Sequence, residues 1–99
     1  MIEVKRLVWD EWNIRYIVRH DVTPEEVEEV CHGAFVASET YSNRLRIVGP
    51  TNAQRMLAVI VGKYAETEGA YYVVTAHSAN AGETKRYREL KGTTNEEKQ

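Results

Sequence analysis

Apolar and polar positions near the start of the chain predict a short strand followed by a helix. The segment 4–9 is rich in β-branched and aromatic residues, and Asp10 after it can cap a helix. Over about 11–20 the apolar residues return at helical spacing, at Trp12, Ile14, Tyr16, Ile17 and Val18. We therefore expect a first strand over 4–9 and an amphipathic helix over 11–20.

A second helix is predicted by a capping signal. Thr23 can cap the helix, Pro24 suits its first position, and Glu26 completes a capping box. The apolar residues that follow fall at i, i+3 and i+4, at Val27, Val30 and Cys31. A helix over about 24–32 would bury this stripe and stop at Gly33, with Cys31 as a small core residue.

The middle of the chain has the texture of β-structure. Runs of β-forming residues separated by turn residues predict strands at 34–39, 44–48, 56–61 and 70–76. The run 56–61 has almost no polar interruption, so we expect a central strand buried on both faces.

A final helix is expected from Glu83 to about Lys91. The polar segment 93–99 has no apolar anchor and is expected to fray as a disordered tail. The predicted order is β-α-α-β-β-β-α, an α+β fold in which an antiparallel sheet packs against helices within one domain over 1–92.

Composition agrees with a single small globular domain. The chain has 99 residues, of which 42% are hydrophobic and 28% charged. One cysteine cannot form an internal disulfide, which favours a reducing cytoplasm. No apolar run approaches the roughly 20 residues of a membrane span, and charges interrupt the N-terminal segment, so we expect neither insertion nor export.

Charge is unevenly distributed along the chain. Residues 1–40 carry a net charge of −5, whereas residues 41–92 carry +4. A basic second half could meet a polyanion such as RNA with one face, although an uneven solvated surface explains the same numbers.

Three histidines are candidates for chemistry. His20 and His32 end the two predicted helices, where a histidine side chain complements exposed carbonyl groups. Their spacing and the lone cysteine give no zinc motif, so no metal or cofactor is expected. His77 follows the last predicted strand, where an imidazole could take a 2′-hydroxyl proton or protonate a leaving 5′-oxygen.

Two arginines are candidates for phosphate binding. Arg44 and Arg46 lie two apart on a predicted strand, so both guanidinium groups project from one face and could clamp a phosphate. The same spacing also describes the solvent face of an ordinary strand. Nucleotide-binding glycine motifs and a serine-hydrolase elbow are absent from the sequence.

Several short motifs follow one another in a characteristic order. They are Val8-Trp9-Asp10, Asn13-Ile14, Arg19-His20, the run 22–30, Arg46-Ile47-Val48-Gly49, Arg55-Met56-Leu57, Val73-Val74-Thr75-Ala76, Glu83 and Tyr87. In order and spacing they resemble the BrnT family of type II toxins, which has the RelE-like ribonuclease fold. The resemblance covers roughly residues 5–90.

The resemblance implies a cytoplasmic, metal-independent ribonuclease toxin that blocks translation. It also implies a BrnA-type antitoxin as the partner. The expected assembly is a homodimer of this chain or a heterotetramer with the antitoxin. Its expected catalytic residues are Arg46, His77, Glu83 and Tyr87. Of the expected RNA-binding residues it implies Arg46 and Arg55, and the other basic residues of the second half add Arg44, Lys63, Lys85 and Arg86.

This chain departs from the family pattern at two places. The family usually has arginine where this chain has His77, and a basic cluster where this chain has residues 81–84. Because losing one charge-stabilising donor costs roughly 10²–10³ in rate, a catalytically inactive toxin-like domain that binds protein or RNA is an alternative. A structural or regulatory nucleic-acid binder is a third.

Overall fold

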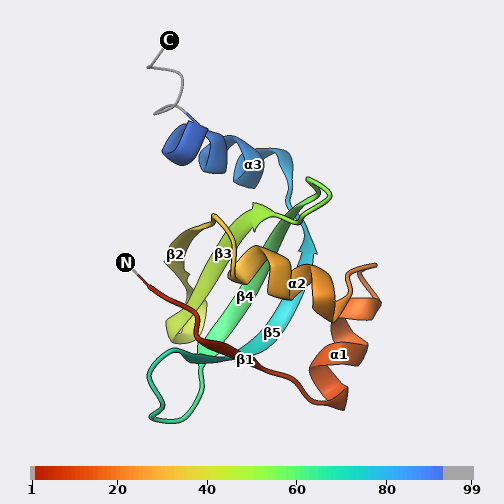
Figure 1. The fold of residues 1–99 in the computed structure, drawn as a ribbon, viewed down its shortest axis with the longest axis vertical. Helices are drawn as coiled ribbons and strands as arrows, with labels where there is room; N and C mark the ends of the chain where they lie inside the picture. Colours follow the sequence, from red (N-terminus) through yellow and green to blue (C-terminus); the bar gives the residue numbers. More distant parts are fainter. Residues whose placement is uncertain (1, 93–99) are drawn as a thin grey trace.

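The computed structural model describes residues 2–92, which form a sheet with helices packed on it (Figure 1). In chain order the elements are β1 (Arg6–Val8), α1 (Glu11–Val18), α2 (Pro24–Cys31), β2 (Val36–Thr40), β3 (Arg44–Pro50), β4 (Met56–Lys63), β5 (Ala70–Ser78) and α3 (Ala81–Tyr87). A 3₁₀ turn at Tyr41–Asn43 joins β2 to β3, and a π-type turn at Arg88–Gly92 follows α3. The predicted α+β class is confirmed, while the predicted tail at 93–99 lies outside the described residues.

All five strands predicted by residue range are present, in the sheet order β1-β5-β4-β3-β2, although the condensed order β-α-α-β-β-β-α counts one strand too few after the second helix. The sheet differs from the prediction in being mixed, because β1 runs parallel to β5 while the other neighbours are antiparallel. Pairing between distant segments leaves no local sequence signal, which is why the parallel edge was not predicted.

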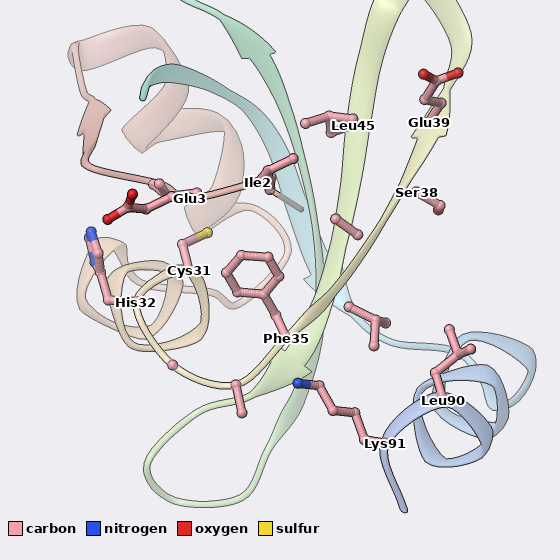
Figure 2. Close-up of a pocket in the computed structure, with 15 residues that line it drawn as sticks. Ile2, Glu3, Cys31, His32, Phe35, Ser38, Glu39, Leu45, Leu90 and Lys91 are labelled. Atoms are coloured by element: carbon pink, nitrogen blue, oxygen red, sulfur yellow. The ribbon is translucent and has the colours of Figure 1, made fainter. Parts of the chain in front are cut away.

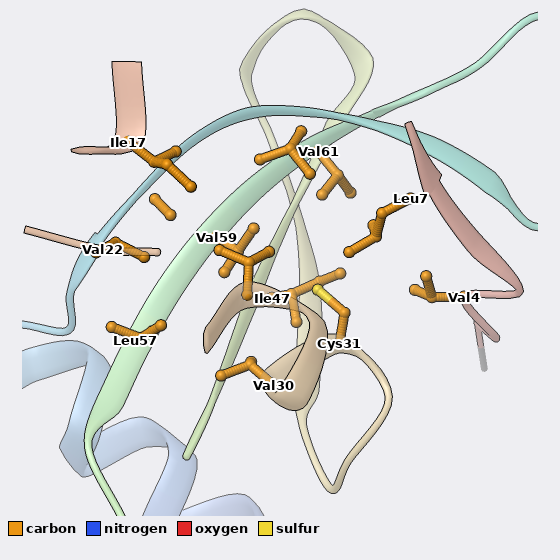
Figure 3. Close-up of a cluster of buried hydrophobic side chains, with 13 residues drawn as sticks. Val4, Leu7, Ile17, Val22, Val30, Cys31, Ile47, Leu57, Val59 and Val61 are labelled. Carbon is orange, nitrogen blue, oxygen red and sulfur yellow. The ribbon is translucent and has the colours of Figure 1, made fainter. Parts of the chain in front are cut away.

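One face of the sheet is buried under α1 and α2. The stripe predicted on the second helix is confirmed, because Val27, Val30 and Cys31 are almost completely buried. They pack against Ile17 of α1 and the inward residues of the strands, including Ile47, Leu57, Val59, Val61 and Val73 (Figure 3). Burial, with a smaller contribution from Glu28, raises the pKa of the Cys31 thiol to about 12, so the side chain stays neutral in the core.

The first helix is shorter and less buried than predicted. It ends at Val18, and its buried side chains are Asn13 and Ile17. Trp12 is 66% exposed, Tyr16 44% and Val18 55%, although their spacing suggested a core-facing stripe. This short helix touches the sheet along a narrow line beside β5, so most of its apolar residues have nothing to pack against.

The buried amide of Asn13 joins three elements. Its Nδ2 donates to the carbonyl oxygens of Val8 at 2.9 Å and Val73 at 3.0 Å, linking β1 to β5 beyond their last paired residues. Its Oδ1 accepts from the Asp10 N–H at 2.8 Å and completes the capping box of α1. One side chain therefore fixes the parallel edge of the sheet and the start of α1.

Among residues 2–92, no helix combines the length and the apolar character that a membrane crossing requires.

We expect Asn13→Asp to lower the free energy of unfolding by roughly 2–4 kcal/mol. The variant keeps an acceptor for the capping box but turns a carboxylate oxygen toward two carbonyl oxygens that lose their donor. Urea unfolding at neutral pH measures the change. The neighbouring Trp12→Ala is the control, with an expected loss below about 1 kcal/mol because its ring is exposed. Equal stability of the Asn13→Asp variant and the wild type would contradict the assignment.

Candidate functional site

The face of the sheet opposite α1 and α2 carries polar and charged side chains, and we call it the open face. Successive residues of a strand point to opposite faces. Because Ile47 of β3 is buried toward α2, its neighbours Arg46 and Val48 point to the open face. Opposite Arg46 in the register stand Ser38 of β2 and Ile60 of β4.

A β-bulge brings His77 to the same open face. Ile60 pairs with Thr75 but Val61 pairs with Val73, which leaves Val74 as an extra residue in β5. Val73 and Ala76 can therefore both face the core, and both are completely buried. The bulge reverses the alternation of β5, so Thr75 and His77 point away from the core. His77 lies within β5, opposite Ala58, rather than after the strand as predicted.

Glu83 reaches this face from the first turn of α3. The helix begins at Ala81, two residues before the predicted start, because Asn80 and Glu83 form a reciprocal capping box. Glu83 Oε1 accepts from the Asn80 N–H at 2.9 Å. The same oxygen lies 3.5 Å from His77 Nε2, and Oε2 lies 3.6 Å from Arg46 Nε. Three of the predicted catalytic residues, Arg46, His77 and Glu83, therefore lie together.

Arg46 keeps unused donor capacity in this cluster. Its Nε is buried and has no hydrogen-bond partner within residues 2–92, since the Glu83 oxygen lies beyond hydrogen-bond distance. Its Nη2 donates to Thr40 Oγ1 over a long 3.4 Å. Arg46, Glu83 and Arg86 line a pocket of about 370 Å³ between β2, β3 and α3. An anion in this pocket would satisfy a buried donor that is otherwise costly to leave unpaired.

The other predicted RNA-binding lysines and arginines are dispersed. Arg44 lines a different pocket, with its guanidinium 5.6 Å from the centre of the Tyr41 ring, and the expected clamp with Arg46 stays a prediction. Lys63 is the last residue of β4 and lies two and four positions after Val61 and Val59. Because side chains alternate along a strand, it points to the same helix-covered face as these two core residues. The Lys85 ammonium is exposed and lies 4.0 Å from Glu89 Oε2.

Arg55 has partners that give it a structural role. Its Nη1 donates to Glu26 Oε1 at 3.0 Å and to the Asp21 carbonyl at 2.8 Å, and its Nη2 donates to Ser78 Oγ at 2.9 Å. It thereby ties the start of α2 to the end of β5. The hydrogen bond from the Thr23 N–H, more than the adjacent Arg55, holds the pKa of Glu26 below its ordinary value of 4.5.

Tyr87 lies one helical turn beyond Glu83 on α3. Its hydroxyl donates to the Ala34 carbonyl at 3.1 Å and holds α3 against the segment before β2. The pocket that contains Arg46 and Glu83 is lined by other residues of α3. The structure therefore gives Tyr87 a packing contact, and its catalytic role stays a prediction.

The remaining histidines lie apart from this cluster. His32 ends α2 with its Nδ1 3.1 Å from the Glu28 carbonyl, the kind of helix-end contact expected from the sequence. His20 contacts the edge of the Tyr16 ring. Within residues 2–92 no three His, Cys, Asp or Glu side chains are grouped as metal ligands.

A larger groove, of about 890 Å³, lies elsewhere. It runs between the N-terminal segment, the residues from the end of α2 through β2, and the turn after α3 (Figure 2). Phe35, Leu45 and Leu90 contribute apolar side chains to its wall. The predicted catalytic residues lie outside it, so size alone does not identify the candidate site.

Sequence reasoning missed Ser38, Thr40 and Asn80 as parts of the site. Ser38 and Thr40 alternate on β2 and face Arg46 and Arg44 in the register, so their period of two was the available signal. Asn80 followed three residues later by Glu83 was a visible capping box.

The fold has a known counterpart. The structure of the Brucella abortus ribonuclease toxin BrnT superposes with a TM-score of 0.61 and 23% sequence identity, covering 76% of this chain and 96% of that chain. The chain has a BrnT-like fold. No protein-family model matches the sequence, and neither does any curated protein. The BrnT-like fold thus rests on three-dimensional similarity, in agreement with the motifs in the sequence.

The Glu26 carboxylate predicts a pH-dependent contribution to stability. Because its pKa is lowered in the folded state, the contribution is complete above the ordinary value of 4.5 and disappears as the pH falls through the lower, folded value. Glu26→Gln keeps a capping-box side chain but loses the charge beside Arg55. We expect the variant to be less stable by roughly 0.5–1 kcal/mol at pH 7 and equal to the wild type well below pH 4.5. Urea unfolding across this pH range tests it, and a difference that persists in acid would contradict the assignment.

Proposed function

We propose that this protein is the ribonuclease component of a cytoplasmic type II toxin–antitoxin pair. The observation that carries the proposal is the cluster of Arg46, His77 and Glu83, in which the buried Arg46 Nε makes no hydrogen bond within residues 2–92 and only a 3.6 Å ion pair with Glu83. This arrangement offers a phosphate-binding donor next to two groups that can exchange protons. The BrnT-like fold, shared with a protein that is a ribonuclease toxin, supports the same conclusion.

The proposed reaction is metal-independent attack of a ribose 2′-oxygen on the adjacent phosphorus. The 2′-O–P bond forms, the P–O5′ bond breaks, and the products are a 2′,3′-cyclic phosphate and a 5′-hydroxyl. With Nε2–H directed toward Glu83, His77 Nδ1 carries the lone pair that accepts the 2′-hydroxyl proton. Glu83 stabilises the resulting imidazolium, and the leaving 5′-oxygen takes a proton from solvent.

In this scheme Arg46 and Arg86 stabilise the charge that develops on the phosphate oxygens. A guanidinium offers several donors in a fixed plane, which suits the equatorial oxygens of a phosphorane. Both residues line the same pocket as Glu83. Tyr87 is proposed to assist from the next turn of α3.

Charge separation between the faces supports an approach of RNA from the open face. Helix α2 on the covered face carries Glu25, Glu26, Glu28 and Glu29. The open face and α3 carry Arg44, Arg46, Lys85 and Arg86. A polyanion is therefore attracted to the open face and repelled by α2. We further propose that a BrnA-type antitoxin is the partner of this chain. The chain would form a homodimer, or a heterotetramer with the antitoxin.

A catalytically inactive binding module is the second candidate. The specific observation in its favour is that Glu83 places a carboxylate within 3.6 Å of Arg46, where it competes with a phosphate. The binding of Arg55 to Glu26 removes another cation from the expected RNA surface. Such a module would bind its protein partner tightly and turn over no RNA.

We expect His77→Ala and Arg46→Ala each to lower the rate of RNA cleavage by about 10²-fold or more, because each removes a group that acts in the transition state. Cleavage of a labelled single-stranded RNA by the purified protein, with EDTA present, measures the rate. Mapping of the cyclic-phosphate and 5′-hydroxyl ends identifies the reaction.

Lys63→Ala is the matched control, since it removes a positive charge from the other face of the sheet. Unfolding midpoints of all three variants should stay close to the wild type. Normal cleavage by both site variants would refute the site. Absence of cleavage by the wild type, together with a stable complex with its partner on size exclusion, would favour the inactive module.

A further inference from the structure

Beside the candidate site lies a second pocket, which we call the aromatic groove. It has a volume of about 420 Å³, within the usual range of ligand-binding pockets. It lies between α1, the turn after β2, the start of β3 and the middle of β5. Its lining includes Trp12, Tyr16, Tyr41, Arg44, Tyr72 and Thr75.

Three aromatic rings of this groove are exposed to solvent. Trp12 and Tyr16 lie four residues apart on one face of α1, and Tyr41, which is 55% exposed, approaches from the turn between β2 and β3. The core of the protein uses none of these rings. Large exposed rings that converge on one hollow indicate binding more than packing.

Each of these rings is accompanied by an arginine. The guanidinium carbon lies 5.6 Å from the ring centre for Arg15 on Trp12, 6.0 Å for Arg19 on Tyr16, and 5.6 Å for Arg44 on Tyr41. Arg44 lines the groove itself, and Arg15 and Arg19 lie beside its rings, so flat π-surfaces are accompanied by positive charge, as in sites for single-stranded nucleic acid.

The acidic side chain that contacts the lining of the groove is Asp10. Asp10 accepts the Trp12 and Asn13 N–H groups as the cap of α1. Its two oxygens also accept the Tyr72 hydroxyl, at 3.1 and 3.0 Å. These hydrogen bonds hold the carboxylate at the start of α1, where it has a structural role.

Two strands lead from the groove to the cluster of Arg46, His77 and Glu83. Arg44 precedes Arg46 by two residues on β3, and Thr75 precedes His77 by two on β5. Two residues of a strand span about 7 Å, so nucleotides next to a phosphate at Arg46 reach the groove.

We propose that the aromatic groove stacks bases of single-stranded RNA beside the phosphate held at Arg46. This inference rests on the proposed function, because it takes the cluster as the place where the RNA backbone is held. Charge complementarity favours RNA over a protein segment, since every exposed ring in the groove has a guanidinium next to it. Trp12 and Tyr41 are the binding residues to test first.

The test uses two ligands that differ only in their bases. One is an eight-nucleotide 2′-O-methyl oligouridylate, which cannot undergo attack by the 2′-oxygen, and the other is an abasic strand with the same number of phosphates. Affinities of the full-length protein and its variants for both strands are measured by fluorescence anisotropy at fixed salt concentration.

For oligouridylate we expect Trp12→Ala and Tyr41→Ala each to weaken binding about 10-fold, as loss of one stacked base does. Trp12→Phe should keep most of the affinity. The wild type should bind the abasic strand more weakly, and Trp12→Ala should not weaken it further. Tyr64→Ala is the matched control, because Tyr64 is also exposed, at 40%, and lies near Arg6, but outside the groove.

Other outcomes overturn the inference in distinguishable ways. If both aromatic variants bind oligouridylate like the wild type while Arg46→Ala binds weakly, the groove is refuted and the phosphate site stands. If the wild type binds neither strand, the groove and the proposed function both fail. If Trp12→Ala keeps its RNA affinity but loses a co-purifying protein, the surface is a protein interface instead.

Discussion

Burial of one face of the sheet under α1 and α2 is the constraint on which the rest of the structure depends. Side chains alternate along a strand, so each residue committed to the core assigns its neighbours to the other face. Ile47 lies completely within the core, and Arg46 next to it is thereby directed to the open face. The hydrophobic layer thus determines where charge can be placed, before any interaction with a ligand is considered. The bulge at Val74 modifies this constraint at one point, because the extra residue reverses the phase of β5, so that Ala76 completes the core and His77 reaches the open face.

The sequence correctly predicted features that depend only on neighbouring residues, such as helix caps and the apolar face of a helix. Thr23 and Glu26 form the predicted capping box, and the stripe of α2 is buried as expected. The proximity of Arg46, His77 and Glu83 depends instead on strand register, the bulge and the position of α3, none of which has a short-range signal. Its chemistry and the family resemblance were enough to select each residue as a candidate. The distances between the three side chains could not be predicted from the sequence.

Long-range partners and the extent of packing surface account for features that the sequence did not predict. Arg55 is as basic as Arg46 in the sequence, yet it binds Glu26, a partner 29 positions away. Trp12 is apolar at helical spacing, but apolar character does not ensure burial when a short helix meets the sheet along a narrow line. The residues next to Arg55 do not predict its ion pair with Glu26. The residues next to Trp12 do not predict how much of α1 the sheet covers.

Glu83 shows how the helix cap and the candidate site are coupled. Its Oε1 accepts the Asn80 N–H at 2.9 Å, whereas His77 Nε2 and Arg46 Nε lie farther from the carboxylate, at 3.5 and 3.6 Å. The backbone of α3 therefore positions this carboxylate more firmly than the two basic side chains do. A phosphate bound at Arg46 need not displace Glu83, because the cap retains the carboxylate beside His77. A carboxylate fixed by the helix, next to an arginine with an unused donor, accommodates an incoming anion with little change in the fold.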